Sequence, residues 1–334
     1  MLQGTGNLPL KILKNGAIIF RNLSMDGCGD KKYRIVTHAH ADHYKHVITS
    51  SKKALKVIAT PETFAILDGL NIIVPRNKRY ELNIDGKIML DDSTNVEFLK
   101  SEHIPGSVSP VVTTDDLVIG YTGDFKLEGT EIISKPDILV VDATYGSPNH
   151  IRSWNNNDVL DEIISLYKQS KGRLWLYGYY GKIQGVLLKL RDLGFDEPVI
   201  MTSKMYKITR NLSKIISGRF GEFSLLGTKE ARDLLRDKVI VMDHATSFYR
   251  YKSSRVGMHV LLNGWEFRKP IMQVDQRSYI ASYSDHSDYI GTLRYVEESK
   301  PKTVIVDSSR SEYAGFFAYI LRRKLGINAI AMPI

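Results

Sequence analysis

The sequence has few of the features that mark secreted, membrane or disulfide-stabilised proteins. Its 334 residues include one cysteine, Cys28, which excludes an internal disulfide and a zinc site built from several cysteines. No apolar run approaches the roughly 20 residues that span a bilayer, and the N-terminal MLQGTGNLPLKILKNG lacks the apolar segment of a secretory signal. Internal repeats and low-complexity tracts are missing as well. We therefore expect a soluble, cytoplasmic protein in a reducing compartment, with no membrane partner.

The sequence also lacks an excess of acidic residues. The chain carries 46 Lys and Arg against 37 Asp and Glu, a net charge of +9. The whole excess lies in residues 152–269, which hold 21 basic and 12 acidic residues, whereas the rest of the chain holds 25 of each. A segregated excess is typical of a surface that faces a polyanion, although a solvated lysine-rich face would give the same count. We expect nucleic acid, as single-stranded DNA or RNA, to be the partner, and the sequence makes no prediction of the oligomeric state.

The sequence pattern predicts an outer domain that is interrupted by an insert. Residues 1–146 form short strand-like runs, rich in β-branched residues and broken by Gly, Asp, Asn or Pro. Residues 147–272 alternate predicted helices and strands, which is typical of a compact and mainly parallel α/β unit. Residues 273–334 are expected to return to the outer domain. The insert coincides with the basic stretch, so it is the part expected to contact nucleic acid.

The strongest local signal is the heptapeptide Thr-His-Ala-His-Ala-Asp-His at 37–43, at the end of a predicted strand. It places His38, His40, Asp42 and His43 as potential ligands within six residues. Alternation along a strand points His38 and His40 the same way, and the following turn brings the other two near. Imidazole and carboxylate groups suit Zn²⁺, with Mn²⁺ or Fe²⁺ as alternatives. The motif therefore predicts a metal centre.

Two later residues continue this pattern. His103 ends the predicted strand Asn-Val-Glu-Phe-Leu-Lys-Ser, and Asp124 ends Leu-Val-Ile-Gly-Tyr-Thr-Gly. Either residue taken alone would be interpreted as a turn residue. Because they follow the heptapeptide in order, we predict that both are ligands.

The whole order, His-x-His-x-Asp-His, then a distal His, then an Asp, resembles that of the metallo-β-lactamase superfamily. The resemblance implies an α/β fold, an αββα sandwich with the metal ions at one edge of its two sheets. It implies one or two Zn²⁺ ions, with Mn²⁺ as an alternative. The implied ligands are His38, His40 and His103 for the first ion, Asp42 and His43 for the second, and Asp124 as a bridge.

Further motifs resemble one branch of that superfamily. Asp142 lies in Leu-Val-Val-Asp-Ala-Thr-Tyr-Gly, and His286 lies in Ser-Tyr-Ser-Asp-His-Ser, on either side of the basic insert. This arrangement is similar to the β-CASP nucleases, which include messenger-RNA 3′-end cleavage enzymes, RNase J and Artemis-like DNA repair nucleases. The resemblance implies that Asp142 and His286 form a carboxylate–imidazole pair beside the metals. It also implies that the insert is a β-CASP cap domain.

One position departs from the RNA-cleaving members of that group, and a second departs from the pattern of β-CASP caps in general. Those enzymes carry a third family histidine after the strand that follows a late Lys-Pro, where this chain has Ser308. Artemis-like enzymes lack this histidine too, so the departure favours DNA, and a neutral hydroxyl at that position argues against tight binding of a second ion. In the insert, Lys182 follows a Gly-Tyr-Tyr-Gly turn and takes the place of a family arginine. We expect Lys182 and Ser308 to contact the substrate.

The sequence therefore predicts a zinc-dependent nuclease, with a DNA exonuclease acting on single strands favoured over an endonuclease. Asp42, His286 and Asp142 are the predicted catalytic residues, with Asp42 orienting water and His286 acting as a general acid. An RNA-processing ribonuclease of the same family is the main alternative. A small-molecule metallohydrolase and an inactive scaffold remain as alternatives from other classes. The basic insert and the Asp142–His286 pair argue against the first, which weak and salt-insensitive DNA binding would favour, and the intact metal ligands argue against the second.

Overall fold

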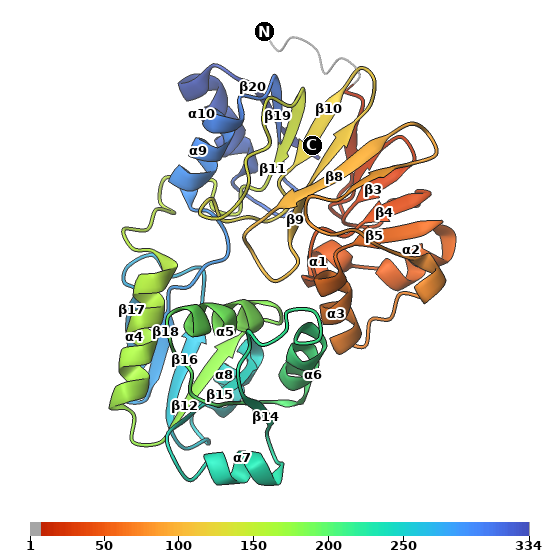
Figure 1. Ribbon diagram of the computed structural model, residues 1–334. Coiled ribbons are helices and arrows are strands. Elements are labelled where there is room, and N and C mark those ends of the chain that lie inside the picture. The colour runs from red at the N-terminus through yellow and green to blue at the C-terminus, as the bar shows by residue number, and fades with distance from the viewer. Residues whose placement is uncertain (1–7, 334) are drawn as a thin grey trace.

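Two structural parts are stacked one above the other (Figure 1). The structure, a computed structural model, describes residues 8–333. The upper part in Figure 1 contains two sheets that pack face to face, and the lower part contains a third sheet with its own helices. No helix in the described range combines the length and apolarity that a membrane crossing needs.

The first sheet and its helices come from the first quarter of the chain. Its strands, in spatial order, are β1 (Lys11–Ile12), β2 (Ile18–Phe20), β3 (Leu23–Met25), β4 (Tyr33–Ile35), β5 (Lys56–Ala59) and β6 (Arg79–Glu81). The connections carry α1 (Ala41–Tyr44), α2 (Val47–Lys53), α3 (Pro61–Gly69) and the 3₁₀ turn η1 (Arg76–Lys78). Helix α3 begins at Pro61, because the Thr60 side chain accepts a hydrogen bond from the Thr63 N–H and proline suits the first helical position.

The second sheet joins the middle of the chain to its C-terminal segment. Its spatial order is β20 (Asn328–Met332), β19 (Thr303–Asp307), β11 (Ile138–Val141), β10 (Val118–Tyr121), β9 (Val108–Thr113), β8 (Asn95–Lys100) and β7 (Lys87–Met89). Helices α9 (Tyr289–Ser299) and α10 (Ala314–Leu325) pack on its outer face, over a core that includes Phe317 and Val306. Strand β11 is buried throughout because it lies between parallel neighbours and is covered on both faces.

A dry core fills the space between the first two sheets. Phe20 and Ile35 from the first sheet meet Phe98, Tyr121 and Ile305 from the second, and all five side chains are buried. Helices lie outside each sheet, which gives the four-layer order helix, sheet, sheet, helix. This is the αββα arrangement expected from the sequence.

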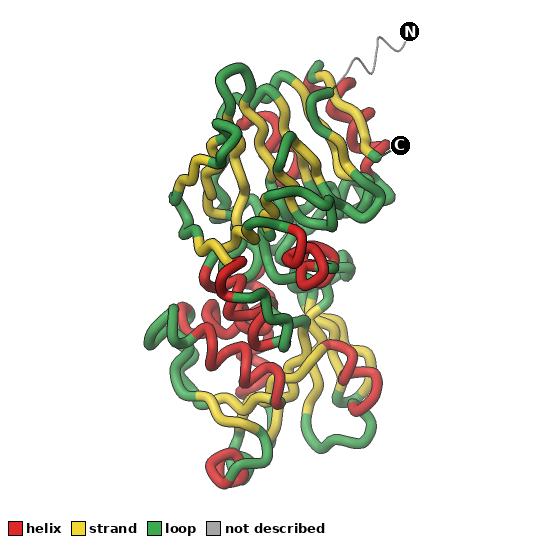
Figure 2. Tube along the Cα trace, turned by 90° about the vertical axis from the view of Figure 1, so that its right-hand side faces the viewer, coloured by secondary structure: helices red, strands yellow, loops and turns green. Residues whose placement is uncertain are grey.

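The third sheet belongs to the insert. Its spatial order is β14 (Phe223–Leu225), β13 (Val199–Met201), β15 (Val239–His244), β12 (Arg173–Gly178), β16 (Met258–Leu262), β18 (Ser278–Ala281) and β17 (Ile271–Asp275). All neighbours are parallel except β17 and β18, so the expected parallel α/β unit is present. The sheet is flanked by α4 (Asn156–Gln169), α5 (Lys182–Asp192), α6 (Ser203–Leu212), α7 (Lys229–Leu234) and α8 (Ala245–Tyr251). The tube in Figure 2 shows this part as a separate lobe below the sandwich.

The point at which the chain leaves the insert differs from the sequence expectation. We expected the return at residue 273, but β18 pairs with β16 and β17 pairs with β18, so both strands extend the third sheet. The return to the sandwich therefore follows Ala281. A strand-like run does not reveal which sheet it joins, because its partner is set by packing far away in the chain.

The two parts share a continuous apolar core. Ile66 and Val57 of the sandwich belong to the same buried cluster as Ile183 and Ile208 of the insert. Helices α3 and α6 come close together, because a Cβ added to Gly69 would lie 2.6 Å from Ile208 Cγ1 and 2.8 Å from Ile208 Cα. Glycine therefore allows these two helices to touch, and their contact holds the insert against the sandwich.

Replacing Gly69 with Ala should destabilise the protein by about 1–3 kcal/mol, because the new methyl group would overpack the α3–α6 contact. Gly315→Ala is the matched control, since Gly315 is also helical and a Cβ there meets nothing within 4 Å. The control should be neutral or stabilising by up to about 1 kcal/mol, through helix propensity. Urea unfolding measures both changes, and equal effects of the two substitutions would contradict the tight contact.

Candidate functional site

The residues predicted to hold the first ion converge at one edge of the sandwich. His38 and His40 follow β4, and α1 begins at Ala41 directly afterwards. His103 and Asp124 follow β8 and β10, which run in the same direction because each is antiparallel to β9 between them. One potential ligand atom from each of the three histidines and the aspartate lies within 4.8 Å of all the others.

The spacing of these atoms matches the coordination sphere of one ion. His40 Nδ1 lies 3.2 Å from His38 Nε2 and 2.9 Å from His103 Nε2. Asp124 Oδ2 lies 3.6 Å from His38 Nε2 and 3.7 Å from His103 Nε2. Ligand atoms about 2.0–2.1 Å from a tetrahedral zinc ion are about 3.3–3.4 Å apart, so the four side chains fit a single Zn²⁺.

The protonation of the histidines supports the same assignment. Burial, followed by the neighbouring imidazoles, lowers the pKa of His38 well below its usual value and the pKa of His40 and of His103 to about 3. The three rings are therefore neutral near pH 7 and offer lone pairs. The Nδ1–H of His103 donates to the Asp285 carbonyl at 3.0 Å, which leaves its Nε2 free to face the other ligands.

Asp42 and His43, predicted to hold a second ion, lie beside this set but belong to neither of the two close donor clusters in the described chain. His43 Nε2 lies 3.2 Å from Asp42 Oδ2 and 3.2 Å from Asp124 Oδ1. On its other side, the His43 Nδ1–H donates to Asp26 Oδ2 at 2.8 Å. Asp42 Oδ2 is also ion-paired with Arg310, at 3.2 Å from its Nε.

Asp26 holds the heptapeptide in place through hydrogen bonds to Thr37 and His43. Its carboxylate is fully buried and accepts hydrogen bonds from the Thr37 N–H and hydroxyl, at 2.9 and 2.8 Å, and from the Tyr121 hydroxyl at 3.0 Å. Burial raises the pKa of Asp26, but His43 more than offsets this effect, so the pKa is lowered. An ionised carboxylate therefore fixes the strand end that carries the metal motif.

Asp142 and His286, 144 residues apart in the chain, form the pair that the sequence predicts. The His286 Nδ1–H donates to Asp142 Oδ2 at 2.9 Å, and Asp142 Oδ1 accepts from the Thr144 N–H and hydroxyl. The other nitrogen, His286 Nε2, faces the metal set, 3.8 Å from Asp124 Oδ2. Burial lowers the pKa of His286, but Asp124 and then Asp142 outweigh it, so the pKa is raised.

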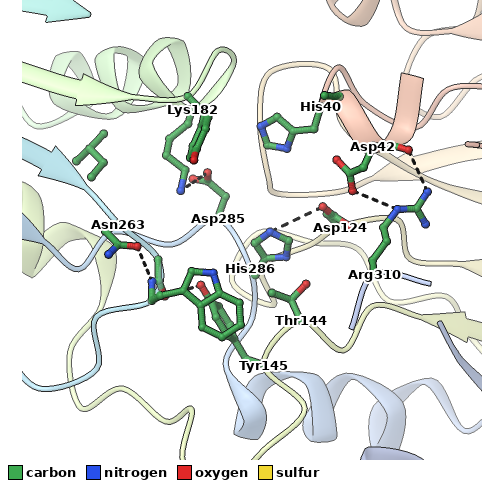
Figure 3. Close-up of a pocket in the computed structure, with 15 residues that line it drawn as sticks. His40, Asp42, Asp124, Thr144, Tyr145, Lys182, Asn263, Asp285, His286 and Arg310 are labelled. Atoms are coloured by element: carbon green, nitrogen blue, oxygen red, sulfur yellow. Dashed lines mark hydrogen bonds and ion pairs between the residues drawn. The ribbon is translucent and has the colours of Figure 1, made fainter. Parts of the chain in front are cut away.

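A cavity of about 420 Å³ opens between the sandwich and the insert, and the site lines it (Figure 3). Lys182 reaches it from the start of α5, with its Nζ 3.2 Å from Asp285 Oδ2 and its side chain 11% exposed. The turn before Lys182 rests on the loop that carries His103, because Gly181 has φ +85° and a Cβ there would lie 2.5 Å from Ile104 Cδ1. The lining residues that carry polar or aromatic groups are His40, Asp42, Asp124, Thr144, Tyr145, Tyr179, Lys182, Asn263, Trp265, Asp285, His286 and Arg310.

Ser308, which the sequence predicts to contact the substrate, does not line the cavity. The Ser308 hydroxyl donates to the Pro333 carbonyl at 2.6 Å, and its N–H donates to the Met332 carbonyl, so Ser308 faces the C-terminal strand. This orientation does not support the expected substrate contact of Ser308, which stays a prediction. Arg310, in the same loop, enters the site instead. Sequence reasoning missed Arg310 because a single arginine in a loop carries no local pattern, and only its place after a buried strand pointed to the site.

Sequence comparison with known proteins points to the same superfamily as the motifs do. A family model described as a β-lactamase superfamily domain matches residues 32–176. An uncharacterised protein in the lig 3′ region of Acidianus ambivalens is 36% identical over 129 residues, which cover 37% of this chain and 89% of that protein. A probable DNA ligase of Opitutus terrae is 25% identical over 92% of this chain, and the matched region spans only 29% of the ligase.

Two further similarities extend over nearly the whole chain. An RNase J-like protein of Methanocaldococcus jannaschii is 23% identical over 88% of this chain and 85% of its own length. A crystal structure of a protein of unknown function from Enterococcus faecalis superposes with a TM-score of 0.60, over 87% of this chain and 89% of that one. At 11% identity, that likeness concerns the fold alone. Together with the site geometry, these matches mean that the chain belongs to the metallo-β-lactamase superfamily, in its β-CASP nuclease group.

Proposed function

We propose that the chain is a metal-dependent phosphodiesterase that cleaves nucleic acid strands. The observation that carries this proposal is the convergence of the four metal donors and the Asp142–His286 pair beside one cavity, whose lining includes members of both groups. The cavity lies between the sandwich and the basic insert, so a polyanion would lie over both. The ribonuclease name of one relative supports the same reaction class.

The described residues fit Zn²⁺ or Mn²⁺ at the first site. Neutral imidazoles from His38, His40 and His103 and the carboxylate of Asp124 would hold the ion. Such an ion lowers the pKa of a bound water towards 7 and neutralises charge on phosphate oxygens.

Asp42 and His286 flank the position where the scissile phosphate would lie. The Asp42 side chain is 57% exposed at the cavity, and its carboxylate, although paired with Arg310 through Oδ2, would orient the attacking water. His286, whose raised pKa favours the protonated ring, would donate from Nε2 to the departing oxygen, while Asp142 holds its Nδ1–H. A general acid of this kind contributes about 10²–10⁴-fold to the rate.

The insert would bind the strand that is being cleaved. Lys182 supplies a cation at the start of α5, suited to a phosphate oxygen next to the scissile one. Trp265 and Tyr179 line the same cavity with 54% and 55% of their surface exposed. Exposed aromatic rings beside a phosphate site stack on bases of a single strand without regard to sequence.

DNA is the proposed substrate, with exonucleolytic cleavage of single strands. A relative named as a probable DNA ligase contains a region that matches 92% of this chain, which would couple such a nuclease to strand joining. The chain also has Ser308 where RNA-cleaving members have a third histidine, and this difference favours DNA as well. RNA is the alternative substrate, favoured by the RNase J-like relative.

His103→Asn should abolish the stabilisation that Zn²⁺ gives to the protein. An ion present at 100 times its Kd stabilises by about 2.7 kcal/mol, so the Tm of the wild type should rise when zinc is added after chelation. His46→Asn is the control, because His46 is exposed and its φ of 59° suits asparagine. Thermal unfolding with and without Zn²⁺ gives the answer, and an equal rise for His103→Asn would refute its role as a ligand.

His286→Asn should lower kcat for strand cleavage by about 10²–10⁴-fold and leave the bound metal unchanged, because the ring acts as an acid and not as a ligand. Cleavage is measured under single-turnover conditions, with metal content determined on the same samples and His46→Asn as the control. A variant that keeps full activity would exclude the general-acid role.

Matched single-stranded DNA and RNA, labelled at either end, should separate the two substrates. We expect mononucleotide release from one end of DNA, with weaker action on RNA, and a loss of both in Asp42→Asn. Internal fragments from both ends would indicate an endonuclease, and a preference for RNA would overturn the choice of DNA.

A further inference from the structure

The Arg310 side chain is held in place beside the candidate metal site. It lies in the loop between β19 and α10, three residues beyond Asp307, and its side chain is 13% exposed at the cavity wall. The sequence analysis placed Ser308 in this loop, where RNA-cleaving members have a third histidine, and expected Ser308 to contact the substrate. The loop instead turns Ser308 away and points a guanidinium at Asp42 (Figure 3).

Several groups hold the guanidinium in place. Arg310 Nη1 donates to Asp307 Oδ2 at 2.7 Å, and Nη2 donates to the carbonyls of Gly16 and Asp42 at 3.3 and 3.4 Å. Gly16 has φ +80°, and a Cβ at this position would lie 2.3 Å from Nη2. The slot therefore requires a residue without a side chain, and it fixes the cation instead of leaving it mobile in solvent.

The guanidinium engages an oxygen that a second ion would need. Asp42 Oδ2 lies 3.2 Å from His43 Nε2, the other expected ligand of that ion, and also 3.2 Å from Arg310 Nε. A divalent cation between Asp42 and His43 would have to share this carboxylate with a permanent positive charge. Among the described residues, Asp42 and His43 therefore lack the additional histidine that would complete a second site, and the positive charge of Arg310 opposes the binding of a second cation there.

We propose that Arg310 takes the place of a second metal ion, so that the chain binds one divalent ion tightly and keeps a fixed cation beside Asp42. The inference rests on the metal site of the proposed function but not on its substrate. Arg310 acts as a positioning residue, because it holds the Asp42 carboxylate towards the phosphate site and balances its charge. The positive charge at this point then does not depend on the supply of metal.

The number of ions per chain tests the proposal without any nucleic acid. Tag-free protein is stripped with a chelator, reloaded with excess ZnCl₂, desalted and weighed by native mass spectrometry. We expect one ion in the wild type and one in Arg310→Lys, which keeps the charge. Arg310→Gln should bind a second and weaker ion, and Asp42→Asn in the Arg310→Gln background should return the count to one.

Asp42→Asn alone keeps the test valid if Arg310→Gln does not fold. Asp42 is largely exposed, so the variant should fold, and it should still hold one ion with unchanged affinity. Two ions in the wild type that fall to one in Asp42→Asn would overturn the proposal, as would a folded Arg310→Gln that stays at one ion under saturating zinc. If the wild type binds no ion, both the metal site and this inference are overturned. If the ion counts are as expected but the protein does not cleave nucleic acid, only the proposed function is overturned.

Discussion

The structure depends on the burial of four metal donors against one another. Three imidazole rings and the Asp124 carboxylate meet with one ligand atom of each within 4.8 Å of the others, in surroundings that keep the rings neutral. Buried nitrogen lone pairs without proton donors cost free energy, and one divalent ion would satisfy all of them at once. The strand ends, the Asp26 anchor and the Asp285 carbonyl all serve to hold this arrangement rigid.

The position of the insert is fixed by the same region. The turn before Lys182 packs on Ile104, next to the His103 ligand, and α6 contacts α3 through Gly69. Because the buried core continues from the sandwich into the insert, the cavity wall that carries Lys182 cannot move freely relative to the metal edge. A phosphodiester backbone lying across both parts, as proposed, would meet charges at set distances, which the positioning of a reacting phosphate requires.

A feature could be predicted from the sequence when the residues that form it are close together in the chain. The 37–43 motif is contiguous, so its ligands could be named from the sequence, and strand periodicity gave the layers and the parallel insert. His103, Asp124 and His286 could be assigned only through a family resemblance, because their partners are far away in the chain. Arg310 and the sheet joined by residues 278–281 were missed, since both are decided by tertiary packing and not by local pattern.

A fixed guanidinium and an exchangeable ion are different solutions to one electrostatic problem. A phosphate that is attacked beside Asp42 and Asp124 would face two carboxylates, so positive charge is needed near both. An ion held at the first site would neutralise Asp124, and Arg310 is paired with Asp42 on the opposite wall to Lys182 (Figure 3). A guanidinium cannot bind or activate water as a metal does, so under the proposal a bound ion would have to supply the attacking water. The proposed division would leave the activation of water to one ion and part of the charge balance to the protein.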